Sequence, residues 1–158
     1  RHMENKQVVD ASVMVGKVSA AVASRQDDDF MVIARTDARA PHGLDEALRR
    51  ATAYAEAGAD MLFLEALQDV EEIERVAAEF AGVPLLFNWV EGGKTPQLTY
   101  DEIAALGFAI IIMPIGMLLA ATAAMSDART IFFKSTISRL TMVIAGRQYG
   151  SPPTLIRC

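Results

Sequence analysis

Residues 44–65 read LDEALRRATAYAEAGADMLFLE, and this stretch holds one complete unit of the pattern that decides the fold. Leu44–Ala57 has the apolar spacing of an amphipathic helix, with acidic residues in the first turn, where the helix dipole favours them. Gly58 suits the C′ position that ends such a helix, because glycine adopts a left-handed conformation without strain. Met61–Leu64 is a short apolar run that ends at Glu65. The stretch therefore predicts a helix, a tight turn and a buried strand.

The same alternation of helices and short apolar strands extends over residues 8–125. The apolar run Phe30–Ala34 predicts a strand that is buried on both faces, as in parallel sheets. Thr99 and Glu102 have the spacing of a capping box, which predicts the start of a short helix. The remaining patterns predict helices at Val8–Ser24, Val70–Phe80, Tyr100–Leu106 and Met117–Met125, and strands at Pro84–Phe87 and Phe108–Met113.

Repeated strand–helix units with apolar strands imply a parallel sheet. A (β/α)8 barrel has eight such units in about 250 residues. The four units of this chain therefore predict an α/β fold with the size of half a (β/α)8 barrel. An open, four-stranded, doubly wound sheet is the alternative that the pattern leaves open.

The composition excludes several classes of partner. A net charge of −5 gives no electrostatic footprint for nucleic acid. The longest apolar run, Phe108–Ala121, is too short for a membrane span, which needs about 20 residues. We therefore expect neither nucleic acid nor a membrane as a partner. The only cysteine is Cys158, which rules out an internal disulfide and fits a reducing compartment such as the cytoplasm.

Charge is unevenly distributed along the chain. Residues 127–158 contain one acid, Asp127, and five bases, whereas nearly all the acids lie in residues 1–126. Ser151-Pro152-Pro153 favours an irregular end, because proline does not continue a helix. We therefore predict a βα domain over residues 1–126 and an atypical basic tail over residues 127–158, helical and then irregular.

Polar residues follow three successive predicted strands at their carboxyl ends, where function lies in parallel βα folds. Arg35 follows the first strand, Glu65 the second and Asn88 the third. An arginine fork suits a carboxylate, a glutamate can accept a proton or hold a metal-bound water, and an amide can donate to an oxyanion. The trio indicates a small acidic substrate and an enolate-like intermediate. Two alternatives stay open: Arg35 and Glu65 could form a structural ion pair, and Asn88 could cap the following loop.

Three blocks of the chain resemble successive blocks of the isocitrate lyase and phosphoenolpyruvate mutase superfamily, including its 2-methylisocitrate lyase and carboxyvinyl-carboxyphosphonate phosphorylmutase branches. The blocks are Ile33-Ala34-Arg35-Thr36-Asp37-Ala38, Phe63-Leu64-Glu65-Ala66 preceded by Glu56-Ala57-Gly58-Ala59-Asp60, and Phe87-Asn88-Trp89-Val90-Glu91-Gly92-Gly93-Lys94-Thr95-Pro96. The resemblance implies the second half of a (β/α)8 TIM barrel. It also implies a Mg²⁺-dependent enzyme that cleaves or forms C–C bonds in carboxylic acids, or rearranges P–C bonds.

The resemblance also implies roles for individual residues. Arg35 would bind a substrate carboxylate, and Glu65 would be the catalytic residue beside the metal-bound waters. Asn88 would contact substrate oxygens, while Thr95 and Pro96 would shape the pocket. The Gly-Gly-Lys-Thr-Pro form of the third block is nearer to the branch acting on oxaloacetate and 2-alkylmalates than to the phosphonate mutases.

The chain departs from the pattern of the superfamily in ways that bear on activity. The Mg²⁺ carboxylates and the cysteine general acid of the family belong to the first half of the barrel, which this sequence does not include. Leu118 and Leu119 occupy a region where many of the lyases have an arginine, which argues against a tricarboxylate substrate. We therefore expect a fragment or half-barrel that is inactive alone, with no main metal ligands of its own.

Three functional hypotheses follow. The first is a parent Mg²⁺-dependent C–C bond lyase that acts on an oxaloacetate- or 2-alkylmalate-like acid through a pyruvate enolate. The second is a phosphonate mutase, such as carboxyvinyl-carboxyphosphonate or phosphoenolpyruvate phosphonomutase. The third is a non-catalytic half-barrel that acts as an interaction module. Because unpaired edge strands invite association, the expected partners are a small carboxylic acid and either further copies of the chain or the missing half-barrel.

Overall fold

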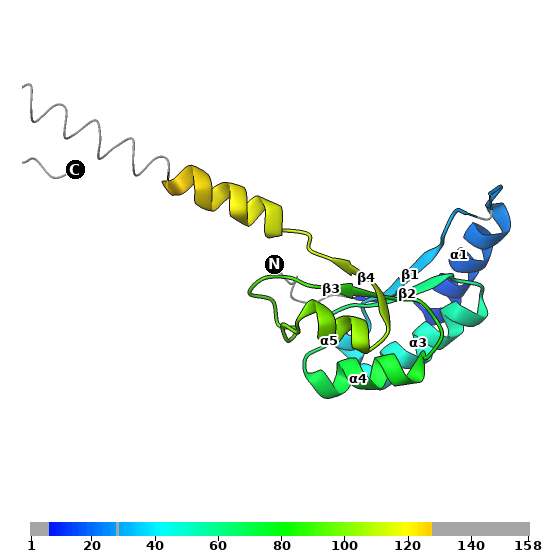
Figure 1. The fold of residues 1–158 in the computed structure, drawn as a ribbon. Helices are drawn as coiled ribbons and strands as arrows, with labels where there is room; N and C mark the ends of the chain where they lie inside the picture. The colour runs from blue at the N-terminus through cyan, green and yellow to red at the C-terminus, as the bar shows by residue number, and fades with distance from the viewer. Residues whose placement is uncertain (1–6, 28, 128–158) are drawn as a thin grey trace, which may run out of the picture. The chain divides into compact units, whose positions relative to one another are not determined.

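The computed structural model describes residues 7–27 and 29–127, which contain a four-stranded parallel sheet (Figure 1). The strands lie in the order β1-β2-β3-β4, and each neighbouring pair is parallel. Their bounds are Ile33–Thr36 for β1, Met61–Leu64 for β2, Leu85–Asn88 for β3 and Phe108–Ile112 for β4. The helices are α1 (Ala11–Ser24), α2 (Arg39–His42), α3 (Leu44–Glu56), α4 (Val70–Glu79) and α5 (Tyr100–Ala105).

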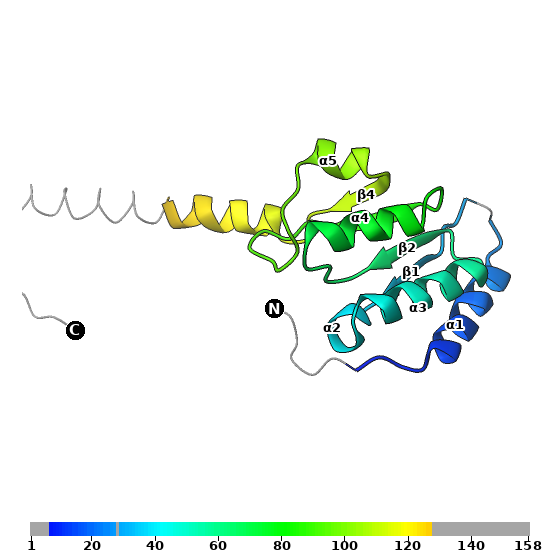
Figure 2. The same ribbon diagram turned by 90° about the horizontal axis from the view of Figure 1, so that it is seen from below.

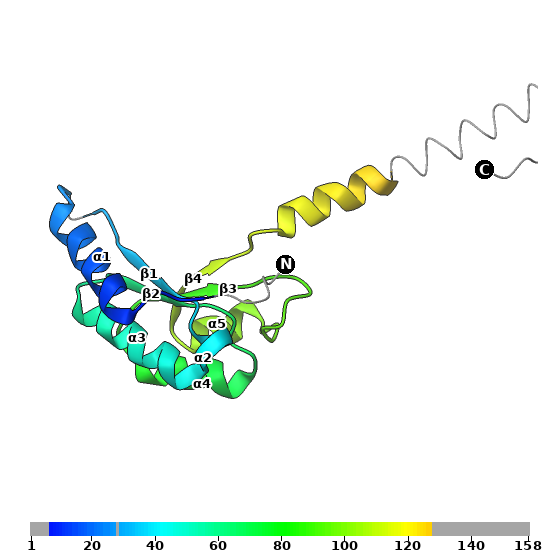
Figure 3. The same cartoon turned by 180° about the vertical axis from the view of Figure 1, so that it is seen from behind.

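The order of the strands and the position of the helices decide between the two folds that the sequence left open. Figures 1 and 3 show α3, α4 and α5 on the same face of the sheet, and Figure 2 looks onto that face. A doubly wound sheet reverses its strand order and carries helices on both faces. Sequential strands with all crossover helices on one face are the winding of a (β/α)8 barrel, so the predicted α/β barrel fold is confirmed.

Side chains alternate between the two faces of the sheet. The face under the helices holds the main hydrophobic core, whose largest fully buried side chains are Tyr54, Leu62, Ile73, Leu85, Ile103 and Val76. The opposite face, called the open face below, holds a smaller cluster made by Met61, Phe63, Leu86 and Ile112. The sheet therefore has one face devoted to packing and one that presents side chains away from the helices.

Capping residues set the helix boundaries. Thr99 accepts a hydrogen bond from the Glu102 backbone N–H, and the Glu102 carboxylate accepts one from the Thr99 N–H, which confirms the predicted capping box. Gly58 follows α3 with a φ of 95°, as expected for a C′ glycine. α1 begins at Ala11, three residues later than predicted, because the Asp10 carboxylate caps the helix there.

The prediction that Phe30–Ala34 forms a strand buried on both faces is wrong. β1 begins only at Ile33, because its partner strand β2 begins at Met61. Phe30 is 63% exposed, and burial alternates along β1. Within the described chain, β1 is an edge strand with helices over one face alone, so only alternate side chains are buried.

The chain divides into two compact units, Arg1–Gly116 and Met117–Cys158, and the sheet belongs to the first. Residues 116–127 are helical, in agreement with the helix predicted there. The predicted basic tail lies outside the described residues except for Asp127, so its structure and the domain boundary after residue 126 stay predictions. In the described ranges, no helix is both long and apolar enough to cross a membrane.

Candidate active site

Arg35, Glu65 and Asn88 lie at the carboxyl ends of three neighbouring strands, and the structure brings their side chains together. Arg35 Nη2 lies 3.5 Å from Glu65 Oε2. Asn88 Nδ2 donates a hydrogen bond of 3.3 Å to the same carboxylate oxygen. Glu65 is buried between its two neighbours. The side chains that the sequence singled out therefore form one cluster, called the rim cluster below, whose catalytic roles stay predictions.

The shortest contacts of the Arg35 guanidinium are with Asp37, two residues further along the chain. Its Nε and Nη2 donate hydrogen bonds of 2.8 and 2.9 Å to the two carboxylate oxygens of Asp37. The guanidinium also lies 4.8 Å from the centroid of the Phe63 ring, a cation–π contact. The hydrogen bond to Asp37 is the main reason that the pKa of Arg35 is raised, so the side chain stays charged. Asp37 thus holds the fork in place at the edge of the open face.

One end of the Asn88 side-chain amide makes a hydrogen bond, and the other end has no partner in the described part of the chain. Its Nδ2 donates to Glu65, whereas its Oδ1 is buried and accepts no hydrogen bond there. A buried acceptor without a donor is costly, and such atoms in a cleft are explained by a ligand or water that supplies the donor. The Asn88 amide therefore faces Glu65 rather than the loop that follows β3, and its role toward a substrate stays a prediction.

A cavity adjoins the rim cluster and is lined in part by Glu65, Asn88 and Thr95. Lys94 also lines this cavity and adds a positive charge to a wall that is otherwise largely apolar. Thr95 therefore lies beside the candidate site, and its role in shaping a substrate pocket stays a prediction. Pro96 is half-buried in the same loop but is not among the described residues that line the cavity.

Ala66 directly follows Glu65 and has a φ of 66°, the left-handed region that residues with a Cβ seldom adopt. In the described ranges it is the single non-glycine residue with a positive φ. Such strained positions cluster at functional sites, where the surrounding structure holds them. Sequence reasoning missed this residue, because an alanine carries no local signal of a left-handed conformation.

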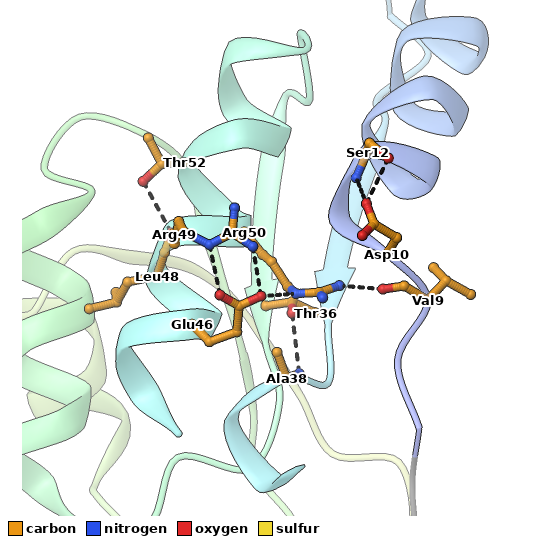
Figure 4. Close-up of polar contacts among 10 residues, drawn as sticks. All are labelled: Val9, Asp10, Ser12, Thr36, Ala38, Glu46, Leu48, Arg49, Arg50 and Thr52. Carbon is orange, nitrogen blue, oxygen red and sulfur yellow. Dashed lines mark hydrogen bonds and ion pairs between the residues drawn. The ribbon is translucent and has the colours of Figure 1, made fainter. Parts of the chain in front are cut away.

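A second polar cluster, drawn in Figure 4, joins α3 to the segment before α1, and sequence reasoning also missed it. Arg50 is a buried arginine on α3 that donates hydrogen bonds of 2.7 Å to the Glu46 carboxylate and to the Val9 backbone carbonyl. Arg49 pairs with the same carboxylate, and the two arginines lower the pKa of Glu46 to about 2. Arg50 and Arg35 line a common cavity, so this cluster fixes the segment that leads into α1 close to the rim.

The Mg²⁺ that the resemblance implies lacks a complete site in residues 7–27 and 29–127. No group of three or more His, Cys, Asp or Glu side chains in these ranges could hold a metal ion. Glu65 is a single carboxylate that already has the Arg35 guanidinium 3.5 Å away, and a neighbouring cation disfavours another. The residues present therefore do not fit a metal site by themselves.

The fold and the rim cluster define the class of protein: half of a (β/α)8 barrel with polar side chains suited to small acids at the carboxyl ends of its strands. The family model described as phosphoenolpyruvate phosphomutase matches residues 1–132, and the chain belongs to this family. This agrees with the resemblance that the three sequence blocks carry.

Several of the curated relatives that match are lyases with longer chains. The 2,3-dimethylmalate lyase of Eubacterium barkeri is 47% identical over 129 residues, which are 82% of this chain and 44% of that protein. The 2-methylisocitrate lyase of Salmonella typhimurium is 42% identical over 130 residues, again 82% of this chain and 44% of that protein. The chain therefore spans less than half the length of these relatives.

Solved structures give the same assignment. A crystal structure of 2,3-dimethylmalate lyase, a PEP mutase/isocitrate lyase superfamily member, has a TM-score of 0.78 at 41% identity, with 84% of this chain and 45% of that chain covered. Oxaloacetate acetylhydrolase in complex with 3,3-difluorooxalacetate has a TM-score of 0.75 at 37% identity, with 80% and 43% covered. Phosphonopyruvate hydrolase in complex with oxalate and Mg²⁺ has a TM-score of 0.64 at 34% identity, with 93% and 53% covered.

Proposed function

We propose that this chain forms half of the substrate site of a Mg²⁺-dependent C–C bond lyase that acts on an oxaloacetate- or 2-alkylmalate-like acid. The observation that carries the proposal is the rim cluster, in which Glu65 lies between Arg35 and Asn88 at the ends of neighbouring strands. The matched relatives named for 2,3-dimethylmalate and 2-methylisocitrate support this substrate class, because both compounds are hydroxy acids with several carboxylates.

In the proposed reaction, the three residues hold the acid and the charge that develops on it. Arg35 orients a substrate carboxylate through its fork, and Asn88 accepts a hydrogen bond from a substrate hydroxyl through Oδ1. For an oxaloacetate-like acid, loss of the terminal carboxylate as CO₂ leaves the electron pair on pyruvate enolate. For a 2-alkylmalate, the hydroxyl proton on C2 is removed and the C2–C3 bond breaks, which releases the corresponding 2-oxo acid, pyruvate in the case of 2-methylmalate. The electron pair then goes to the carbon beside the second carboxylate, where a proton is added.

Glu65 is the proposed catalytic residue of the described chain, because it is the buried carboxylate at the centre of the rim cluster. We propose that it orders the hydroxyl or a metal-bound water, with Thr95 and Pro96 shaping the pocket. The main Mg²⁺ ligands and the general acid are proposed to come from the rest of the barrel. On this basis the 158-residue chain is inactive alone and works in association with a complementary half-barrel or with further copies of itself in the cytoplasm.

A phosphonate mutase is the second candidate, because the matching family model carries the description phosphoenolpyruvate phosphomutase. The same Arg35 fork suits a phosphonate as well as a carboxylate. A non-catalytic half-barrel is the third candidate. The products formed by an assembled barrel distinguish the three.

The first test combines the native mass of the purified chain with its Mg²⁺-dependent release of pyruvate from oxaloacetate and 2-methylmalate. We expect no pyruvate from the chain alone. The chain is then co-expressed with the part of Eubacterium barkeri 2,3-dimethylmalate lyase that it does not match, and we expect the assembled protein to release pyruvate. Conversion of phosphonopyruvate to phosphoenolpyruvate instead would support the mutase.

The matched variants are Arg35→Ala and Arg49→Ala, which remove one guanidinium from the rim cluster and one from the exposed face of α3. We expect Arg35→Ala to lower kcat/KM by at least about 100-fold, as for a lost charge-assisted contact in the transition state, and Arg49→Ala to leave it unchanged. An assembled, active protein in which both variants are equally active would overturn the proposed role of the rim cluster.

A further inference from the structure

Arg35 lies in β1 and Glu65 directly follows β2, and the segments that continue from these two strands separate as soon as the strand pairing ends. The last backbone bond between them joins the Glu65 N–H to the Thr36 carbonyl at 3.0 Å. Beyond it, one loop turns into α2 at Arg39, and the other passes through the strained Ala66 toward α4. Strand pairing therefore fixes the backbones of Arg35 and Glu65, whereas the Arg35 guanidinium is held by Asp37, which lies in the segment beyond the pairing.

One carboxylate joins these two loops. Glu72, in the first turn of α4, accepts hydrogen bonds from both Nε and Nη2 of Arg39, the Nε bond being 2.8 Å long. The same carboxylate accepts the Gln68 backbone N–H at 2.9 Å. Arg39 is the first residue of α2, directly after the loop that follows β1, and Gln68 belongs to the loop after β2, so Glu72 ties the end of one loop to the other.

The environment makes this contact stronger than an ordinary surface ion pair. The side chains of Arg39 and Glu72 are only 17% and 13% exposed. Burial opposes ionisation of Glu72, but Arg39 and the Gln68 N–H outweigh it and hold the pKa of Glu72 below its usual value. A bidentate, largely buried arginine–carboxylate pair fixes both distance and orientation, unlike an exposed pair that is screened by water.

We propose that Arg39 and Glu72 are a positioning pair that sets the placement of Arg35 relative to Glu65 and Asn88. Neither residue lines the cavity beside the rim cluster, so the pair acts through the two loops. Only one consequence of this inference rests on the proposed function, namely that substrate binding depends on the Arg39–Glu72 pair. The geometric statement concerns the rim cluster itself and is testable without any ligand.

The test compares Glu72→Gln with Asp45→Asn in the full chain. Asp45 pairs with Arg75 across α3 and α4 at 2.7 Å, but both side chains are exposed and the pair ties no loop of the rim, so it is a matched control. The readouts are the ¹⁵N–¹H signals of Arg35 Nε and of the Asn88 side-chain amide, assigned with Arg35→Lys and Asn88→Asp variants. We expect both signals to shift in Glu72→Gln and to stay in place in Asp45→Asn.

A double-mutant cycle and a ligand complete the test. We expect Arg39→Ala to cause the same shifts and Arg39→Ala/Glu72→Gln to add nothing further, because the two residues act as one unit. In the assembled barrel, we expect either single variant to weaken binding of the probe oxalate by about tenfold, as for other residues that orient a site from behind. Unmoved Arg35 and Asn88 signals in a folded Glu72→Gln chain would overturn the positioning role. Shifted signals with no oxalate binding by the wild-type assembly would keep that role and reject the proposed function.

Discussion

Apolar residues of similar size differ widely in exposure between the two faces of the sheet. On the helix-covered face, Leu62 is fully buried and Leu85 is nearly so. On the open face, Ile33 is 44% exposed and Ile110 is 39% exposed. Arginine and glutamate side chains are also found toward the open face, at the strand ends. The comparison teaches that the covered face supplies the stability of this fold, whereas the open face and its rim carry the candidate chemistry.

The largest effect that distinguishes the two faces is expected from truncation of one strand residue on each. Leu62→Ala should lower the free energy of unfolding by about 3 kcal/mol, because a fully buried leucine leaves a cavity. Ile33→Ala should lower it by less than about 1 kcal/mol, because nearly half of that side chain is already in water. Urea unfolding followed by circular dichroism measures both.

Equal losses for the two variants would break this comparison, because they would mean that the open face is covered in solution. Repeating the unfolding at several protein concentrations identifies the cover. A cost for Ile33→Ala that grows with concentration would show that a second copy of the chain packs there.

An intermediate effect is expected from pH, through the charged cluster on the helix layer. The folded state holds the pKa of Glu46 at about 2, below its usual value of 4.5, so the unfolded chain binds the proton first as the pH falls. The contribution of Glu46 is complete above pH 4.5 and is lost as the pH falls toward 2. It should be about 1 kcal/mol, because the carboxylate is accessible to water.

Unfolding measured between pH 2 and pH 6 tests this, and Glu46→Gln should flatten the curve in that window. Asp10, Asp60 and Glu102 also have lowered pKa values, so a weaker slope should remain in the variant. A variant curve as steep as that of the wild type would show that the two arginines do not stabilise the folded chain through Glu46.

The smallest effect is expected at the strained rim. Ala66→Gly should raise the free energy of unfolding by roughly 0.5 kcal/mol, because glycine adopts a positive φ without strain. The larger backbone entropy of glycine in the unfolded chain offsets part of this stabilisation. Ala104→Gly in α5 is the matched control, and it should cost about 1 kcal/mol because its backbone is helical and exposed. Losses of equal size at both positions would contradict the strain at Ala66.

Much of the fold could be predicted from local patterns. The capping box at Thr99 and Glu102 and the C′ glycine at Gly58 were predicted because each signal lies within four residues of the element it ends. The three rim residues could be predicted because the carboxyl ends of parallel strands meet at one edge. Burial of Phe30 was predicted wrongly, because an apolar run does not reveal whether its strand is central or at an edge.

The two arginines of α3 show the limit of such patterns. Arg49 and Arg50 are adjacent and chemically identical, yet the Arg49 side chain is 59% exposed and the Arg50 side chain 9% exposed. The difference comes from the 100° turn between successive helical residues, which directs one guanidinium to water and the other toward Val9. The four residues LRRA taken alone do not indicate which of the two arginines is buried.

Apart from α2 and the bounds of β1, the sequence by itself determined the helices, the strands, the caps and the polar residues at the strand ends, because hydrophobic periodicity and capping act over a few neighbouring residues. Only the tertiary structure decided which face of the sheet is covered and which carboxylate each arginine meets. Arg39 and Glu72, which are 33 positions apart in the sequence, illustrate the reason. Their contact exists only because two consecutive βα units wind in the same direction and bring the loop after β1 against the start of α4.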